Sequence, residues 1–283
     1  MKSPNLVSVI IPCYQQAHYL DEAIRSVLAQ TYRHFEIIVV DDGSTDNTSE
    51  VAARYAGLCC IRQRHLGLPS ARNAGLRASE GEYTVFLDAD DLLLSDALET
   101  GVNSLLAEPD CAFVYGLCHF IDQQGAPIPT PPHVPVEESH YRALFKQNYI
   151  WTPGAVMFRR SILSRVTGFD QTFTRGCEDI DLYLRITKHW PIRCHGEVVL
   201  QYRKHRASMS MKKVNMLRAT NDVYRKHQQE VRGDLELEGF CRKHIFPRIV
   251  LQHPLAIRLI AAVRVRTRLR ALKLYFQKFR QAD

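Results

Sequence analysis

The sequence predicts an α/β fold in which helices flank a central sheet. Two observations carry this prediction: apolar runs of strand length alternate along the chain with segments of helical hydrophobic period, and acidic residues directly follow two of these runs. Strands that alternate with helices pair in parallel through right-handed crossovers. Ligands of such sheets collect beyond the carboxyl ends of the strands, which is where the acidic residues are expected.

Short apolar runs within residues 1–116 have the composition of buried strands. They are rich in Val, Ile and Phe, and several of them stop at Pro or Asp. The expected strands are Leu6–Ile11, closed by Pro12, and then Phe35–Val40, Cys59–Arg62, Tyr83–Leu87 and Ala112–Tyr115.

Helical segments lie between these strands. Asp46 and Thr48 supply start signals for one of them, and Pro69 stands in the first turn of another, a position that proline favours. The expected helices are Ala17–Gln30, a segment ending near Ala56, Pro69–Ser79 and Ser95–Ala107.

The regular alternation ends at Gly125–Pro135, whose prolines predict an extended loop. From Met211 onward the chain has a helical and basic pattern. Between these points, the expected elements are a strand at Ala155–Phe158, a helix from Glu178 to about His189, a strand at Val198–Tyr202 and a polar loop at Arg203–Ser210.

The net charge of +7 is concentrated at the end of the chain. Residues 254–283 contain eight Lys or Arg and a single acid, Asp283, an excess equal to that of the whole sequence. We expect this tail to bind an anionic membrane surface or to pack as a basic helical pair on the preceding domain. The rest of the chain is near neutral, so the composition argues against a nucleic-acid binder.

The cysteines and the hydropathy pattern indicate a cytoplasmic protein. Eight cysteines are scattered without a CxxC pair, as expected of thiols in a reducing compartment. The sequence shows no signal peptide and no apolar run of the length needed to span a membrane, which takes about 18 residues or more.

Three carboxylates are crowded within the run FLDADD. Asp88, Asp90 and Asp91 follow the strand Tyr83–Leu87, where like charges repel one another. A cation among them would remove this repulsion, and carboxylate oxygens suit Mg²⁺ or Mn²⁺. The alternative is a solvated acidic turn that caps the next helix.

Five motifs in order resemble the family 2 inverting glycosyltransferases of the GT-A fold, within the nucleotide-diphospho-sugar transferase superfamily. The resemblance covers roughly residues 6–210, and it implies a Rossmann-like mixed sheet flanked by helices. The motifs are VSVIIPCYQQ at Val7–Gln16, VVDDGSTDNT at Val39–Thr48, GLPSARNAGL at Gly67–Leu76, FLDADD at Phe86–Asp91 and CEDIDLYLRI at Cys177–Ile186.

The resemblance implies a nucleotide site at the ends of the first two strands. Pro12 and Tyr14 would contact the nucleotide, and Asp42, with Asp41 beside it, would accept a ring N–H of uracil or guanine. Arg72 in the ARN segment would also reach the nucleotide. The structural alternative for the two aspartates is turn and capping chemistry, because Asp-Gly is a common turn.

The resemblance also implies a metal site. Asp90 would be the chief contact to Mn²⁺ or Mg²⁺, with Asp88 and Asp91 touching metal, ribose or sugar. His205 would contact the metal or the diphosphate, unless it is an ordinary structural histidine. Neighbouring basic residues would add positive charge, namely Arg203, Lys204 and Arg206.

The motif CEDIDLYLRI implies the catalytic base. Asp179 would take the proton of the acceptor hydroxyl, and Glu178 would orient the acceptor. The alternative is that both acids only complement the dipole of a helix N-terminus. Trp151 either stacks on an acceptor sugar or belongs to the core, and the sequence favours the core.

The resemblance thus implies a metal-dependent glycosyltransferase that uses a nucleotide-sugar, with UDP favoured, and a saccharide or lipid-linked acceptor in surface polysaccharide or glycolipid assembly. Its domain would span residues 1–210, with a nucleotide-sugar half to about 116 and an acceptor half beyond it, followed by a helical extension over 211–283. The protein would work peripherally at the inner membrane face. The alternatives are an inactive nucleotide-sugar-binding scaffold or a sugar-phosphate nucleotidyltransferase.

Overall fold

The computed structural model describes residues 5–136, 138–206, 208–211 and 213–244. The chain divides into two compact units, Met1–Ala219 and Thr220–Asp283. The predicted membrane-binding tail at 254–283 lies outside the described residues.

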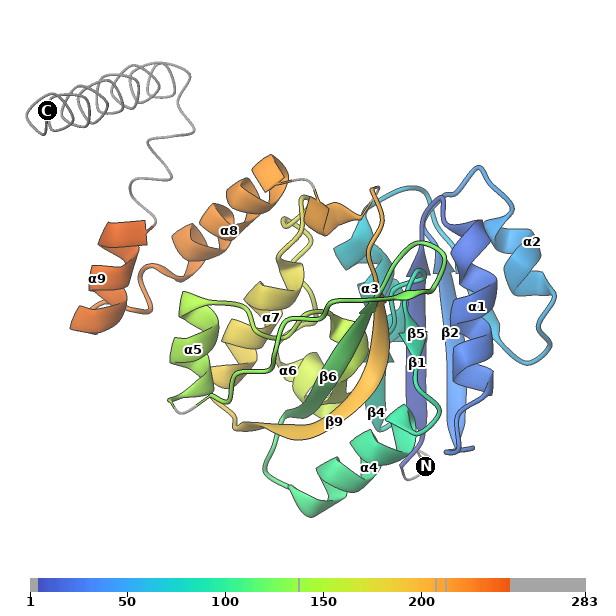
Figure 1. Cartoon of the computed structure of the whole chain (residues 1–283), viewed down its shortest axis with the longest axis horizontal. Coiled ribbons are helices and arrows are strands. Elements are labelled where there is room, and N and C mark those ends of the chain that lie inside the picture. The colour runs from blue at the N-terminus through green and yellow to red at the C-terminus, as the bar shows by residue number, and fades with distance from the viewer. Residues whose placement is uncertain (1–4, 137, 207, 212, 245–283) are drawn as a thin grey trace, which may run out of the picture. The chain divides into compact units, whose positions relative to one another are not determined.

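The first part of the sheet is parallel, as the alternating pattern predicted. Strand β1 pairs with β2 on one side and with β4 on the other, and β2 also pairs with β3. Strands β1 and β2 lie side by side in Figure 1. Their bounds are Val7–Cys13 for β1, Phe35–Asp41 for β2, Cys59–Arg62 for β3 and Tyr83–Phe86 for β4.

The second part makes the sheet mixed, as the family resemblance implied. Strand β8 inserts antiparallel between β4 and β6, so the order is β3-β2-β1-β4-β8-β6-β9-β5, with β7 paired to β6. The alternation of strands and helices alone predicted an all-parallel sheet, and that prediction is wrong. The remaining strands are β5 (Leu92–Leu93), β6 (Phe113–Ile121), β7 (Pro127–Ile128), β8 (Val156–Arg159) and β9 (Ile192–Arg203).

Most helices match the predicted segments, but α5 and α6 were not predicted. Figure 1 shows helices around the sheet of the first unit. That unit contains α1 (Ala17–Leu28), α2 (Thr48–Ala53), α3 (Leu68–Ala78), α4 (Ala97–Ala107), α5 (His140–Lys146), α6 (Arg160–Arg165), α7 (Glu178–Thr187) and two 3-10 turns, Pro153–Ala155 and Met209–Met211. Two further helices follow, α8 (Lys213–His227) and α9 (Leu235–His244).

Strand β1 continues through Pro12, where the sequence analysis ended it. Ile10 accepts a hydrogen bond from the amide of Leu87 on the β4 side, and pairing with β4 stops at Ile10. Bonding sides alternate along a strand, so the Pro12 nitrogen lies on the β4 side, beyond Ile10, the last residue of β1 that pairs with β4. The missing N–H of proline therefore breaks no bond of the sheet.

Helices α1 and α3 cover opposite faces of β1. Val9 and Ile11 belong to one buried cluster with Leu20 and Ile24 of α1. Ile10, between them, faces α3 so closely that a Cβ on Gly75 would clash with its side chain. Glycine at this position lets α3 approach the strand.

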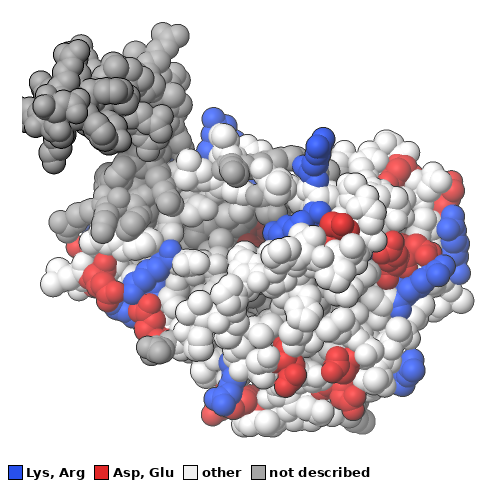
Figure 2. Space-filling view, viewed as in Figure 1, with Lys and Arg blue, Asp and Glu red and all other residues white. Residues whose placement is uncertain are grey.

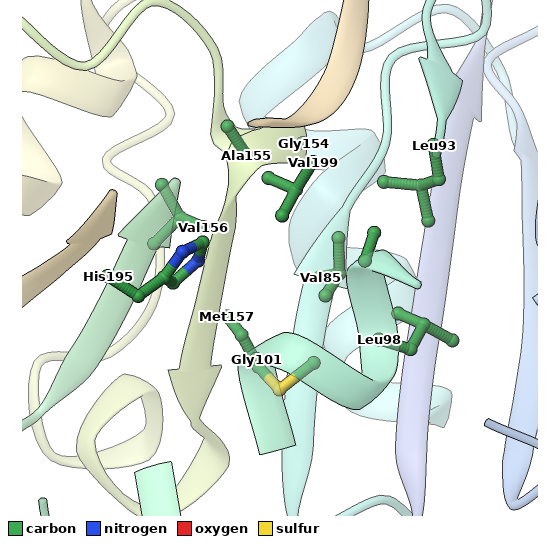
Figure 3. Close-up of a pocket in the computed structure, with 11 residues that line it drawn as sticks. Val85, Leu93, Leu98, Gly101, Gly154, Ala155, Val156, Met157, His195 and Val199 are labelled. Atoms are coloured by element: carbon green, nitrogen blue, oxygen red, sulfur yellow. The ribbon is translucent and has the colours of Figure 1, made fainter. Parts of the chain in front are cut away.

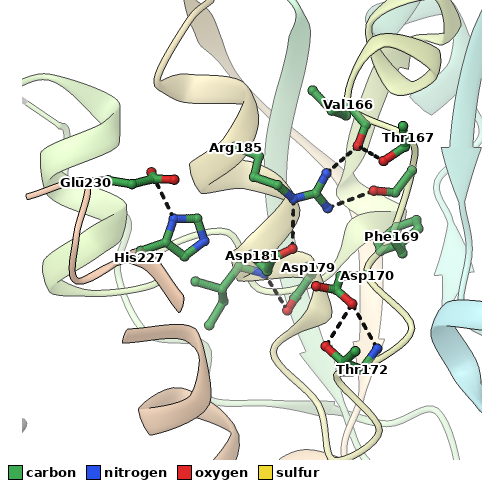
Figure 4. Close-up of polar contacts among 12 residues, drawn as sticks. Val166, Thr167, Phe169, Asp170, Thr172, Asp179, Asp181, Arg185, His227 and Glu230 are labelled. Atoms are coloured by element: carbon green, nitrogen blue, oxygen red, sulfur yellow. Dashed lines mark hydrogen bonds and ion pairs between the residues drawn. The ribbon is translucent and has the colours of Figure 1, made fainter. Parts of the chain in front are cut away.

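A group of backbone anchors fixes the segment that leads to α7 (Figure 4). Arg185 donates to the carbonyls of Val166 at 2.6 Å and Gly168 at 2.7 Å, and pairs with Asp181 at 2.9 Å. Asn73 of α3 accepts from the amide of Phe169 and donates to its carbonyl. Helices α3 and α7 are thereby both hydrogen-bonded to the segment 166–169, which precedes α7 in the chain.

Acidic and basic side chains are interspersed over the described part of the face in Figure 2. Among the described helices, none is both long enough and apolar enough to cross a membrane. All eight cysteines are free thiols, as the sequence analysis predicted.

We predict that Asn73→Ala lowers the free energy of unfolding by about 2–5 kcal/mol, because it strands two buried backbone groups of Phe169. Urea denaturation measures the change. Arg77→Ala, an exposed change one turn further along α3, should stay within about 0.5 kcal/mol of the wild type. Equal stability of Asn73→Ala and Arg77→Ala would contradict the proposed role of the Asn73 anchor.

Candidate active site

A buried arginine joins the two halves of the first unit. Arg72 of α3 donates to Asp88 at 2.7 Å and to Glu178 at 2.6 Å, although Glu178 lies 106 residues away in the sequence. Burial disfavours the charge, yet the two carboxylates raise the pKa of Arg72 above its ordinary value. One guanidinium therefore holds the motifs FLDADD and CEDIDLYLRI together.

The predicted base, Asp179, lies next to this bridge in the first turn of α7. The chain enters the helix through two residues with positive φ, Gly176 at 109° and Cys177 at 66°. Asp179 is partly buried, and burial together with the charge of Glu178 raises its pKa to about 7, against the opposing effect of Arg72. A carboxylate with this pKa is suited to accept a proton near neutral pH.

The three acids of FLDADD have three different partners. Asp88 is paired with Arg72, while Asp91 is fully buried and accepts from the backbone amide of Arg203 at 2.9 Å and from Thr152 at 3.3 Å. Burial and the neighbouring acids raise the pKa of Asp91 well above its ordinary value. Asp91 thus connects β9 to the start of the 3-10 turn Pro153–Ala155 and faces away from solvent.

Asp90 and His205 form the pair best suited to a cation. His205 Nε2 lies 2.8 Å from Asp90 Oδ2, and their side chains are 8% and 15% exposed. No group of three or more His, Cys, Asp or Glu side chains in the described residues is arranged to hold a metal by itself. One or two protein ligands completed by phosphates and water is nevertheless a common Mg²⁺ arrangement, so this donor set fits.

The basic residues beside His205 have mainly structural contacts. Arg203 is buried and donates to the carbonyls of Asp90 and Gln123 and to the carboxylate of Glu22. Lys204 places its ammonium 4.1–5.9 Å from three ring centroids, those of Phe120, Trp151 and Tyr202. Arg206 is exposed.

Trp151 is 43% exposed, so it is not a core residue as the sequence favoured. It lies edge-on to Phe120 and immediately precedes Thr152, whose hydroxyl contacts the acid run. The Trp151 ring centroid also lies 5.9 Å from the Lys204 ammonium.

A second group of predicted residues lies at the carboxyl ends of β1 and β2. Pro12 is buried within β1, and Tyr14, directly after the end of this strand, is 43% exposed. The Tyr14 ring stacks on His65, with centroids 3.9 Å apart and planes 17° from parallel. Asp42 follows β2 and bonds to His65 at 2.8 Å.

Asp41 has the turn contacts that the sequence analysis offered as an alternative. It is fully buried and accepts from the Ser44 amide at 2.8 Å and from the Ser49 hydroxyl at 2.6 Å. Because β2, β1 and β4 are adjacent and parallel, both groups of residues lie at the same edge of the sheet.

Figure 3 shows a pocket that contains none of the predicted site residues. It lies among β4, β8, β9 and α4, and its lining is apolar apart from the imidazole of His195. Its chemistry does not suit a nucleotide.

Three neighbours of the acids were not predicted from the sequence, namely Gln63, His65 and Thr152. A polar residue in a loop gives no periodic signal, and its partner is decided by how the loop closes. Thr152, next to Trp151, belongs to no recognised motif, so its contact with Asp91 could not be predicted.

Comparisons with known proteins identify the family and the fold of the chain. TuaG of Bacillus subtilis, named as a teichuronic acid biosynthesis glycosyltransferase, is 30% identical over 227 residues, which cover 78% of this chain and 87% of TuaG. The mannosyltransferase PcManGT of Pyrobaculum calidifontis, solved with GDP-Man and Mn²⁺, matches at a TM-score of 0.62 and 22% identity over 90% of this chain and 73% of its own.

Staphylococcus aureus TarS 1–349, solved with UDP-GlcNAc, matches at a TM-score of 0.59 and 20% identity, covering 83% of this chain and 69% of its own. The profile described as Glycosyl transferase family 2 matches residues 8–167. These findings confirm the predicted family and fold. The chain therefore belongs to glycosyl transferase family 2 and is a glycosyltransferase of the GT-A fold.

Proposed function

We propose that this glycosyltransferase is metal-dependent and inverting, and that it transfers a sugar from a nucleotide-diphospho-sugar, with UDP favoured, to a hydroxyl of a saccharide or lipid-linked acceptor. The observation that carries the proposal is the Arg72 bridge between Asp88 and Glu178, which holds Asp179 beside the acid run. The bound UDP-GlcNAc and GDP-Man of the two structural neighbours support a nucleotide-sugar donor.

In the proposed reaction, Asp179 accepts the proton of the acceptor hydroxyl. The acceptor oxygen forms a bond to the anomeric carbon from the face opposite the diphosphate, while the bond from that carbon to the diphosphate breaks. The nucleoside diphosphate leaves with the electron pair, so one base suffices and no covalent intermediate is needed.

Asp90 and His205, with Asp88 nearby, would hold Mn²⁺ or Mg²⁺. When bound, the cation stabilises the negative charge of the departing diphosphate. The Mn²⁺ named for PcManGT supports this assignment.

On the acceptor side, the exposed face of Trp151 would stack on a sugar ring, with Lys204 beside it. The relationship to TuaG supports a role in the assembly of a surface polysaccharide. From sequence alone, we further propose that residues 254–283 bind an anionic membrane surface at the cytoplasmic face.

We predict that Asp179→Asn lowers kcat about 10²–10⁴-fold, because the amide cannot take the proton. Turnover of UDP-sugar with a saccharide acceptor measures the rate, and a thermal shift with UDP should persist. Asp110→Asn, at an exposed acid, serves as the control with unchanged kcat. Transfer near the wild-type rate in Asp179→Asn would show that Asp179 is not the base.

We predict that activity rises with pH, reaches half of its plateau at about pH 7 and levels off above that pH, because Asp179 has a pKa of about 7 and works only when deprotonated. Glu178→Gln removes a negative charge that raises this pKa, so the acidic limb should move to lower pH. The measurement is kcat/KM against pH for both proteins. An acidic limb in the same place for both would count against the assignment.

We predict that EDTA abolishes transfer and that Mn²⁺ or Mg²⁺ restores it. Asp90→Asn should weaken Mn²⁺ binding by about tenfold or more, since a carboxylate ligand is lost. Electron paramagnetic resonance of free Mn²⁺ measures binding independently of turnover, and Asp110→Asn is again the control. Full activity in EDTA would overturn the metal assignment.

A further inference from the structure

We propose that the imidazole of His65 occupies the place of the nucleobase in the free enzyme, and that the donor must displace it to bind. The inference rests on the proposed nucleotide-sugar donor. It assigns to His65 control over the affinity for the base.

The first observation is the hydrogen bonding of Asp42. Its Oδ1 accepts from Gln63 Nε2 at 2.6 Å and from the amide of Leu66 at 2.9 Å. Its Oδ2 accepts from His65 Nδ1 at 2.8 Å and from the amide of Gly67 at 2.9 Å. A carboxylate offers about four lone-pair positions, so all of them are used.

A base with a ring N–H can therefore bond to Asp42 only after one donor leaves. The Leu66 and Gly67 amides belong to the turn that begins α3, and moving them would shift the helix start. The side chains of Gln63 and His65 can leave by rotation alone. The His65 side chain is 54% exposed, whereas that of Asp42 is 3% exposed.

The second observation separates His65 from Gln63. The His65 ring stacks on Tyr14 at 3.9 Å and 17°, which covers an aromatic face that a planar base would need. Gln63 covers no ring face in this way among the described contacts.

The ring nitrogen of His65 that bears hydrogen also resembles the ring N–H of a nucleobase. Its Nδ1 faces both Oδ2 of Asp42 and the Asp42 backbone carbonyl at 3.2 Å, and both are acceptors. Nδ1 must therefore carry hydrogen. A flat ring that stacks on Tyr14 and donates N–H to Asp42 makes the same two interactions as uracil or guanine would make there.

The test is calorimetric titration with UMP, which carries the base and ribose but no diphosphate. His65→Ala should bind UMP about 3- to 20-fold more tightly than the wild type, because the competing stack and hydrogen bond are gone. His65→Phe keeps a ring on Tyr14 and should show no gain. Gln63→Ala frees one lone pair but leaves Tyr14 covered, and should also show no gain.

Free imidazole provides a second measurement. It should compete with UMP for His65→Ala, whose slot is open, but barely for the wild type. A crystal structure of the wild type with UMP should show His65 displaced from Tyr14, which checks the inference without any variant.

The outcomes distinguish the placeholder role of His65 from the proposed use of a nucleotide-sugar donor. If neither the wild type nor His65→Ala binds UMP or GMP, the proposed nucleotide-sugar donor is overturned. If the wild type binds UMP but His65→Ala binds it equally or more weakly, the placeholder role is overturned and the donor proposal stands.

Discussion

The organisation of the catalytic unit depends on the burial of one guanidinium. A charged arginine removed from water costs several kcal/mol unless carboxylates neutralise it. Arg72 meets this requirement with Asp88, after β4, and Glu178, at the start of α7. If either carboxylate moved away, the buried charge of Arg72 would lose a partner. The bridge therefore sets where the first turn of α7 lies relative to the acid run.

The crowding of Asp88, Asp90 and Asp91 is relieved without relying on a single cation. Asp88 is compensated by Arg72, Asp90 faces His205, and Asp91 is buried against an amide and a hydroxyl, where its pKa is raised. Each acid of a short run thus acquires a different electrostatic environment. Adjacent carboxylates can then differ in role. Asp90 is available to a ligand beside His205, whereas Asp91 stabilises the fold through buried hydrogen bonds.

Local sequence predicted the elements that carry the motifs. The apolar runs of β1, β2 and β4 and the start of α7 were identified because periodicity and start signals act within a few residues. The antiparallel insertion of β8, the length of β9 and the contact of His65 with Asp42 were not identified. Each depends on which distant segments meet, and that information lies in tertiary packing, not in the period of the sequence.

Two non-glycine residues with positive φ adjoin the two parts of the site: Gln15, at 56°, follows Tyr14, and Cys177, at 66°, precedes Glu178. Few side chains tolerate this backbone, and β-branched ones least of all. Mutant libraries meant to alter donor choice would therefore lose many members to misfolding if they randomised these two positions. Diversity is better placed at Gln63 and His65, where rotamers can change while the main chain stays as it is.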